Sequence, residues 1–392
     1  MKKKILFING HLDSGGCERS LIDVLKKLDY KKYEVDLLLL EHTGDYLEEV
    51  PEEVNIKVYS LDNAFGRLVP CLVRAIRKKD WFSFWFRVEY ICGTKVSRHF
   101  MVCMWKLFKD LRKSYDIVIA YRPGICTELA AFTFQANKKI SWWHHGEMNL
   151  SYHEIKSLDM AYKKMDSIVA VSNSSKKLLE EQFADIKKKL YVVSNMIDPV
   201  ELIKKARKYM PVEFQNTKFK IVSVGRMTPE KNMLLCPKIG CKLKAAGMDF
   251  KWVIIGDGVE KEKIEKEIND YELQKELILI GRNSNPYPYI AEADLMIHPS
   301  LVESQGITII ESMALGTPVV AVRSKGPEEF IESGKNGYLV DNNEVDITNL
   351  IKILYKEPKK RELCAYNATN IIKQFEPDCI IKKIEELLDE KL

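Results

Sequence analysis

Short apolar runs rich in β-branched residues alternate with segments of helical periodicity along almost the whole chain. A short apolar run between turn-forming residues predicts a buried strand, and apolar positions three or four apart predict a helix. Their alternation is typical of parallel sheets with helices on both faces. The predicted strands form two series, at residues 5–9, 33–41, 55–61, 116–121, 139–145, 167–172 and 190–195, and then at 219–225, 250–256, 276–281, 294–300, 317–322 and 336–340.

The two series predict an α/β protein built from two doubly wound domains, which suits a chain of 392 residues. Residues 207–218 are polar, contain a proline and follow neither period, so we expect a linker at 201–217 between domains at 1–200 and 218–372. Residues 373–392 predict an amphipathic helix that packs back on the first domain. Because such sheets bind ligands at the carboxyl ends of their strands, we expect the two domains to face each other across a cleft that holds the site.

Composition and charge exclude several other classes of protein. With 46% hydrophobic and 30% charged residues the chain is expected to fold, and a net charge of +5 is too small to indicate nucleic-acid binding. Its nine cysteines include no C-x-x-C pair, which favours a reducing cytoplasm over a disulfide framework or a zinc site. The basic start leads into an apolar run that ends at Asn9, so it predicts a strand and no signal peptide. We also expect no membrane-spanning helix.

The most informative segment is 298–321, where a predicted strand is followed by a loop and a helix. Glu303 lies in the loop, Gly306 lets the backbone approach a ligand, and the free N–H groups of the helix can hold an anion. Glu311 follows on that helix. A carboxylate there can accept hydrogen bonds from the vicinal hydroxyls of a ribose, while Glu303 can contact a sugar hydroxyl. The alternative is a pair of solvated carboxylates around an ordinary turn.

Two cations follow the strand that ends in Gly225. Cations at such a strand end could stabilise negative charge on a bound or leaving phosphate, so Arg226 and Lys231 are candidate site residues. The alternative interpretation is that Arg226 and Lys231 are solvated cations on the surface. His144 and His145 end the strand 139–145, where a histidine could donate a hydrogen bond to a ligand, and a purely structural role for either stays open.

Two glutamates separated by seven residues, between a His-Pro-Ser strand end and M-A-x-G-x-P-V-V, resemble the retaining family-4 glycosyltransferases of the GT-B fold, which has two Rossmann-like domains. Further segments are similar to that family. They are the Gly-Arg and Lys-Asn stretch at 222–232, the Gly-x-Gly strand end at 255–258, the loop near the nucleotide base at 281–290, the asparagine-containing turn at 192–198 and the N-terminal Gly-Gly-x-Glu-Arg loop at 15–19. The resemblance is dense over 219–341 and sparse over 60–115.

The resemblance implies retaining transfer of a sugar from a nucleotide diphosphate donor, expected to be UDP-linked, to a hydroxyl of a lipid-linked saccharide in surface-polysaccharide biosynthesis. The catalytic residues it implies are His144, Arg226, Lys231 and Glu303. The donor-binding residues are Gly15, Gly16, Gly256, Asn283, Pro286, Gln305, Gly306, Ile307 and Glu311, with His145 and Asn195 as further candidates. Gln305 departs from the family, which often has Phe or Pro there.

The chain contains no D-x-D sequence, so we expect neither a divalent metal nor a cofactor. His298 is expected to support the Glu303 loop. Two rival functions stay open, namely a non-catalytic sugar-nucleotide-binding partner subunit and a nucleotide-sugar epimerase on the same fold.

Residues 67–115 carry twelve Lys or Arg against three acidic residues, together with three of the six tryptophans of the chain, Trp81, Trp85 and Trp105. Basic helices with aromatic anchors suit an anionic membrane surface, so one expectation is a protein peripheral to the inner face of the plasma membrane. The other is a pair of helices that pack their aromatic residues inward.

Overall fold

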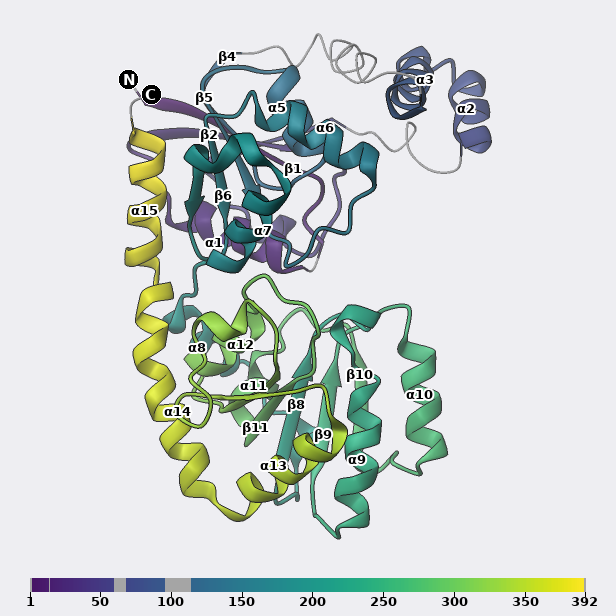
Figure 1. Ribbon diagram of the computed structural model, residues 1–392, viewed down its shortest axis with the longest axis vertical. Helices are drawn as coiled ribbons and strands as arrows, with labels where there is room; N and C mark the ends of the chain where they lie inside the picture. The colour runs from purple at the N-terminus through teal and green to yellow at the C-terminus, as the bar shows by residue number, and fades with distance from the viewer. Residues whose placement is uncertain (1, 14, 60–67, 96–113, 391–392) are drawn as a thin grey trace. The chain divides into compact units, whose positions relative to one another are not determined.

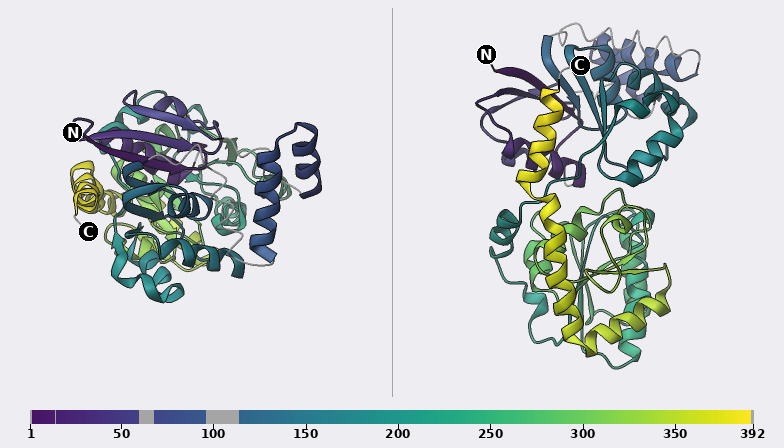
Figure 2. Two further views of the ribbon diagram at one scale, coloured as in Figure 1. Left: turned by 90° about the horizontal axis from the view of Figure 1, so that it is seen from above. Right: turned by 60° about the vertical axis from the view of Figure 1, so that its left-hand side comes forward.

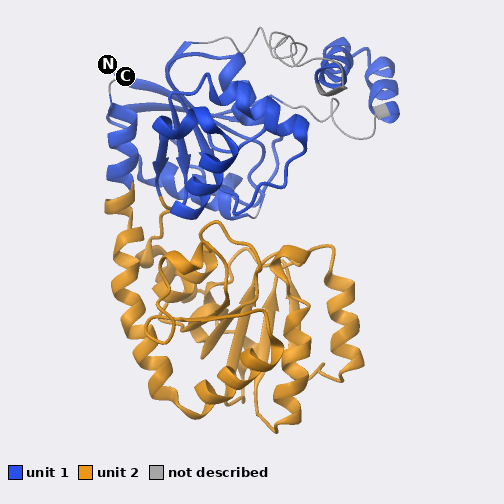
Figure 3. Ribbon diagram, viewed as in Figure 1, with its two compact units in different colours: residues 1–193, 381–392 blue, residues 194–380 orange. Residues whose placement is uncertain are grey.

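The computed structural model describes residues 2–13, 15–59, 68–95 and 114–390 (Figure 1). The chain divides into two compact units (Figure 3). Unit 1 contains residues 1–193 and 381–392, and unit 2 contains residues 194–380. Each unit is built on a parallel sheet with helices on both faces (Figures 1 and 2).

Unit 1 has a seven-stranded sheet in the order β3-β2-β1-β4-β5-β6-β7. Its described strands pair in parallel and are β1 (Lys3–Asn9), β2 (Tyr33–Leu39), β3 (Val54–Val58), β4 (Ser114–Ala120), β5 (Gln135–Trp143), β6 (Ser167–Ala170) and β7 (Leu190–Val192). The described helices within its first 193 residues are α1 (Gly16–Lys27), α2 (Leu68–Arg77), α3 (Trp81–Lys95), α5 (Ile125–Phe132), α6 (Tyr152–Tyr162) and α7 (Asn173–Gln182). Buried strands on both faces explain the continuous apolar runs in the sequence.

Unit 2 has a six-stranded parallel sheet in the order β10-β9-β8-β11-β12-β13. The strands are β8 (Lys220–Val224), β9 (Lys251–Ile255), β10 (Leu277–Gly281), β11 (Leu295–His298), β12 (Val319–Val322) and β13 (Tyr338–Val340). The helices are α8 (Pro199–Ala206), α9 (Leu235–Ala245), α10 (Lys261–Asp270), α11 (Tyr287–Glu292), α12 (Ile307–Ala314), α13 (Glu344–Lys356) and α14 (Pro358–Ile372). In both sheets the strand order reverses beside the first strand, where β1 lies between β2 and β4 and β8 lies between β9 and β11. Ligands of doubly wound sheets bind at that reversal, at the carboxyl ends of the strands.

The boundary between the units differs from the expected linker at 201–217, because the chain leaves unit 1 between Val193 and Ser194. The segment that reads as a linker in the sequence is part of unit 2. Asp198 caps α8 by accepting hydrogen bonds from two backbone N–H groups, and Leu202 and Phe214 are buried in a hydrophobic cluster of unit 2. Isolated apolar anchors of this kind give no periodicity, which is why the pattern misses them.

The last helix, α15 (Pro377–Asp389), belongs to unit 1 from residue 381 onwards. Lys138 on β5 is buried and donates hydrogen bonds to the carbonyl oxygens of Leu387, at 2.7 Å, and Glu390, at 3.1 Å. An ammonium group at the C-terminus of a helix compensates for carbonyls that have no partner within the helix. Lys3 and Lys32 add ion pairs to Asp389 and Glu385 of the same segment.

Within the described ranges, no helix combines the length and the apolar character that crossing a bilayer would require.

Candidate functional site

A carboxylate whose side chain is only 9% exposed, Glu303, lies at the centre of a polar cluster at the carboxyl edge of the unit 2 sheet. Its Oε1 atom lies 2.6 Å from Nζ of Lys231 and 2.8 Å from Nε2 of His298. His298 ends β11, and its Nδ1 lies 3.3 Å from the hydroxyl of Thr308 on α12. The strand end, the loop and the helix therefore hold Glu303 in one position. His298 contacts Glu303 directly, in line with the expectation that it supports this loop.

The environment of Glu303 favours its charged form. Burial alone would raise the pKa of this carboxyl group, but the ammonium of Lys231 and the hydrogen bond from His298 outweigh burial and hold the pKa well below its usual range. Lys231 has three N–H donors, and a single ion pair leaves donors for phosphate oxygens. The pair can therefore offer a fixed cation to an anionic ligand.

The depressed pKa predicts how stability depends on pH. Stabilisation from ionised Glu303 is complete above the pKa of the unfolded chain, about 4.3, and is lost as pH falls from there towards the folded-state pKa. Glu303→Gln should lower the free energy of unfolding at neutral pH by about 2 kcal/mol, less than for a fully enclosed pair because Lys231 keeps some contact with water. Urea unfolding of both proteins should show this difference narrowing below about pH 4. Glu344→Gln, at a surface pair with Lys242, is the control, and a difference that does not change with pH would contradict the expectation.

The second glutamate, Glu311, is buried on α12, and its Oε1 accepts a hydrogen bond from the hydroxyl of Tyr287 at 2.8 Å. Tyr287 begins α11, in the segment 281–290 for which the family resemblance implies a position near a nucleotide base. The hydrogen bond fixes one oxygen of the carboxylate and orients the group.

The turn between Glu303 and Glu311 has a conformation that favours glycine. Gly306 has φ +84° and precedes the first residue of α12, Ile307, so a side chain here would be strained. The preceding residue, Gln305, is buried, and its Oε1 accepts hydrogen bonds from the backbone N–H and the side-chain amide of Asn195, at 2.9 and 2.6 Å. Two predicted site residues 110 positions apart thus meet at the point where the chain enters unit 2.

The ends of β8 and β9 approach each other closely at Gly256. This residue has φ +146°, and a Cβ atom there would lie 1.9 Å from the carbonyl oxygen of Gly225. The backbone N–H of Gly256 donates to the carbonyl oxygen of Gly281 at 2.8 Å, which brings in the end of β10. Arg226 follows Gly225 with an exposed side chain whose guanidinium lies 3.6 Å from Glu230. Unlike Lys231, Arg226 is not part of the Glu303 cluster.

Asn283 and Pro286 lie in the loop after β10. The side chain of Asn283 donates to the hydroxyl of Tyr209 at 3.1 Å and accepts from the backbone N–H of Asn285 at 2.8 Å, while Pro286 precedes the first residue of α11. In this structure the Asn283 side chain holds the loop.

In unit 1 the two histidines follow β5 at the carboxyl edge of the sheet. The His144 ring lies 4.9 Å from the ring of Tyr121, centroid to centroid. His145 is exposed, and its carbonyl oxygen accepts hydrogen bonds from Trp143, at 2.7 Å, and Ser175, at 3.1 Å.

At the same edge of unit 1, Gly15 and Gly16 lie at the start of α1. An added Cβ at Gly15 would lie 2.3 Å from a carboxylate oxygen of Glu18, so Glu18 occupies the space that a side chain would need. Glu18 is buried and lies 3.3 Å from Arg122, whose guanidinium also lies 2.9 Å from Nε2 of His11.

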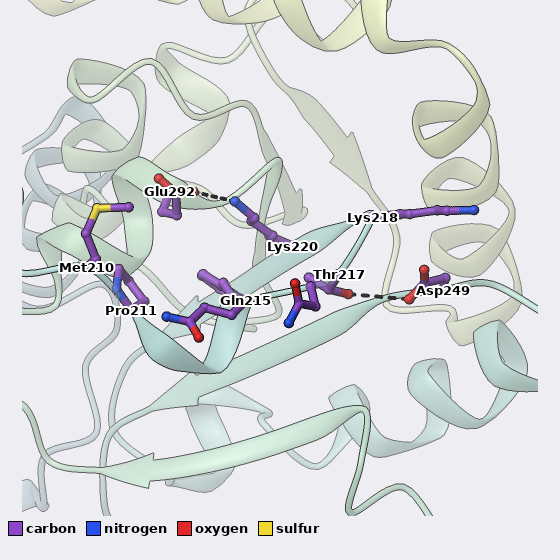
Figure 4. A pocket seen from close by; sticks show the side chains of 10 residues that line it. Met210, Pro211, Gln215, Thr217, Lys218, Lys220, Asp249 and Glu292 are labelled. Carbon is purple, nitrogen blue, oxygen red and sulfur yellow. Dashed lines mark hydrogen bonds and ion pairs between the residues drawn. The ribbon is translucent and has the colours of Figure 1, made fainter.

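The described residues contain no group of three or more His, Cys, Asp or Glu side chains that could hold a metal ion. A surface pocket of about 430 Å³ lies at the opposite edge of the unit 2 sheet, by the amino ends of β8 and β9 (Figure 4). Met210, Lys220, Asp249 and Glu292 are among its lining residues, and Lys220 pairs there with Glu292. Its position separates it from the cluster around Glu303.

Two family models together match most of the chain. The model described as Glycosyltransferase Family 4 matches residues 14–201, and the model described as Glycosyl transferases group 1 matches residues 205–371. The chain is a glycosyltransferase of the family-4 type with the GT-B fold.

Curated relatives of this glycosyltransferase include the poly(ribitol-phosphate) alpha-N-acetylglucosaminyltransferase of Staphylococcus aureus, which is 28% identical over 72% of this chain and 57% of the relative. The chain thus spans little more than half the length of that relative. The N-acetylgalactosamine-N,N'-diacetylbacillosaminyl-diphospho-undecaprenol 4-alpha-N-acetylgalactosaminyltransferase of Campylobacter jejuni is 29% identical over 96% of both chains. Among solved structures, Anabaena HepE in complex with UDP-glucose has a TM-score of 0.74 at 19% identity, covering 98% of this chain and 99% of that chain.

Two polar residues at the candidate site escape the sequence analysis. Tyr287 lies inside a recognised loop, but nothing in the sequence indicates that its hydroxyl reaches Glu311, 24 residues further on. Arg122 carries a clearer signal, because a cation directly after a predicted strand in a doubly wound sheet lies at the ligand-binding edge. The roles of the predicted site residues remain predictions.

Proposed function

We propose that this glycosyltransferase moves a sugar from a UDP-linked donor to a hydroxyl of a lipid-linked saccharide, with retention of the anomeric configuration, in surface-polysaccharide biosynthesis. The observation that carries the proposal is the Lys231–Glu303 ion pair at the carboxyl edge of unit 2, on the loop that leads to Glu311. This arrangement supplies a fixed cation for a leaving diphosphate and a carboxylate for the hydroxyls of a ribose.

In the proposed step, the bond between the anomeric carbon and the diphosphate oxygen breaks as the acceptor oxygen bonds to the same face of that carbon. The proton of the acceptor hydroxyl passes to the leaving phosphate, and UDP is released. Lys231, with Arg226 nearby on the chain, stabilises the charge that grows on the diphosphate, so the proposed transfer uses side-chain cations in place of a divalent metal. His144 would contact the donor sugar or position the acceptor.

The printed names of similar proteins support the choice of donor and acceptor. HepE is recorded with UDP-glucose, and the Campylobacter jejuni relative is named for a diphospho-undecaprenol acceptor. An amylovoran biosynthesis glycosyltransferase of Erwinia amylovora is 24% identical over 99% of this chain and 100% of the relative. These names motivate a screen of UDP sugars with undecaprenyl-linked saccharides as acceptors.

The test is transfer from UDP-glucose, UDP-N-acetylglucosamine and UDP-N-acetylgalactosamine, with the anomeric configuration of the product read by NMR. An α-linked product from an α-linked donor supports retention, and a β-linked product contradicts it. Conversion of the donor to its epimer without an acceptor would favour the epimerase. Donor binding without hydrolysis, epimerisation or transfer would favour the non-catalytic subunit.

Glu311→Ala is expected to weaken UDP binding, because it removes the proposed acceptor of the ribose hydroxyls. A hydrogen bond to a charged group is worth about 1.5 to 3 kcal/mol, which corresponds to roughly 10- to 150-fold in Kd. Isothermal titration calorimetry with UDP measures the change. Glu292→Ala, which removes a carboxylate at the opposite edge of the sheet, is the control. Equal affinity in wild type and Glu311→Ala would remove Glu311 from the donor site.

A further inference from the structure

The helix α2 turns an apolar stripe towards solvent. Its side chains Val69, Val73 and Ile76 are 68%, 40% and 50% exposed. Positions four and three residues apart share one face of a helix, so the three form a continuous stripe. Cys71 and Ala75, on the other side of the helix, are buried. The helix therefore packs through one narrow face and presents aliphatic side chains on the opposite face.

The next helix, α3, divides its aromatic residues between two faces. Phe86 is fully buried in the hydrophobic core of unit 1, and Phe82 stacks on it with ring centroids 6.0 Å apart. Trp81 and Trp85, four residues apart, are 58% and 55% exposed. The two phenylalanines therefore pack inward, which was one of the two expectations for this segment. Both tryptophans lie on a face that nothing in the described chain covers.

The charge beside these stripes is strongly positive. Between Val69 and Trp85 the chain has a single acidic residue, Asp80, and four exposed cations, namely Arg74, Arg77, Lys78 and Lys79. The carboxylate of Asp80 accepts hydrogen bonds from the backbone N–H and the hydroxyl of Ser83, at 3.0 and 2.7 Å. It is thus used at the start of α3.

We propose that the α2–α3 pair, residues 68–95, docks on an anionic lipid surface, with the tryptophans and the α2 stripe at headgroup depth and the four cations against lipid phosphates. Tryptophan and aliphatic side chains bordered by Lys and Arg are the combination that binds at the interface of an anionic bilayer. Figures 1 and 2 show the pair projecting at the side of unit 1. The rest of the surface expected at 67–115, including Trp105, lies outside the described residues.

The biological role of this docking surface rests on the proposed function, because an enzyme that acts on a lipid-linked acceptor must reach it at the membrane. Its evidence is separate, since the exposed stripes and cations belong to unit 1 and the Glu303 cluster to unit 2. Docking and transfer can therefore fail independently.

The experiment is co-sedimentation of the full chain with vesicles of equal parts phosphatidylglycerol and phosphatidylcholine, and with phosphatidylcholine alone. Binding to the anionic vesicles is expected at about 0.1 M salt and should weaken at about 1 M, where the Debye length falls from about 10 to about 3 Å. Trp81→Ser with Trp85→Ser should weaken binding by about tenfold or more. Arg77→Gln, Lys78→Gln and Lys79→Gln together should abolish the preference for anionic vesicles.

The matched control is Leu363→Ser with Tyr366→Ser on α14, which removes side chains 60% and 70% exposed in unit 2 and should bind vesicles as the wild type does. UDP affinity and donor turnover without vesicles check that each variant is folded. Absence of wild-type binding at low salt, or unchanged binding by both sets of variants, would overturn the docking surface. A change in oligomeric state with unchanged vesicle binding would overturn it in favour of contact between copies. Vesicle binding without donor turnover would leave docking intact and contradict the proposed function.

Discussion

Replacing Lys231 with methionine should lower kcat by roughly 100- to 1000-fold while changing the Kd for the UDP-sugar donor by less than about tenfold. The charge on the leaving diphosphate grows towards the transition state, so a fixed ammonium group stabilises that state more than bound donor. Glu303 places this ammonium by an ion pair of 2.6 Å. Steady-state kinetics with saturating acceptor, together with calorimetric titration of the UDP-sugar in the absence of acceptor, separates the two effects.

The Lys231 result needs a control for the loss of a half-buried, ion-paired lysine. Lys220→Met provides it, because Lys220 pairs with Glu292 at the amino edge of the same sheet and should leave kcat unchanged. Both variants are assayed at a temperature at which circular dichroism shows them folded. A rise in KM alone in Lys231→Met would mean that Lys231 holds the donor without stabilising the leaving group.

Gly256→Ala should lower the free energy of unfolding by about 3 kcal/mol or more. A methyl group there would meet the carbonyl oxygen of Gly225 at 1.9 Å, and close-packed backbone cannot move aside cheaply. The ends of β8 and β9 would have to separate, so UDP binding should weaken as well. Urea unfolding followed by circular dichroism measures the stability.

The control for Gly256→Ala is Gly247→Ala. Gly247 has φ +70° and no atom within 4 Å of an added Cβ, so only the backbone conformation is strained, at a cost of about 1 to 2 kcal/mol. The difference between the two variants isolates the steric contact with Gly225. Equal costs would show that the strand ends separate readily.

The strands could be predicted from the sequence because they are buried on both faces, as β12 illustrates with its fully buried apolar run Val319–Val322. The polar cluster around Glu303 could be predicted from the sequence for a related reason. Lys231 and Glu303 each follow a strand, and parallel strands bring their carboxyl ends to one edge. Local order along the chain thus predicts which residues gather there.

What the sequence cannot show is which of these residues touch. Gln305 was expected to bind the donor. In the structure its side-chain carbonyl accepts hydrogen bonds from Asn195, a contact that no local pattern encodes. For α2 and α3 the sequence left open which face of each helix packs inward and which faces solvent. Periodicity defines an apolar stripe, but a stripe can pack inward or face solvent, and only the burial of Cys71 and Phe86 shows which sides pack.

The tie between Lys138 and the last helix has a consequence for the order of biosynthesis. Unit 1 is completed by residues 381–392, which the ribosome adds only after all of unit 2. Until then the Lys138 ammonium lacks the carbonyl oxygens of Leu387 and Glu390, and burying it unpaired would be costly. The first 193 residues therefore emerge as an incomplete unit that must wait for its final segment, so a ribosome stalled within unit 2 should present a nascent chain with unusual protease sensitivity around β5.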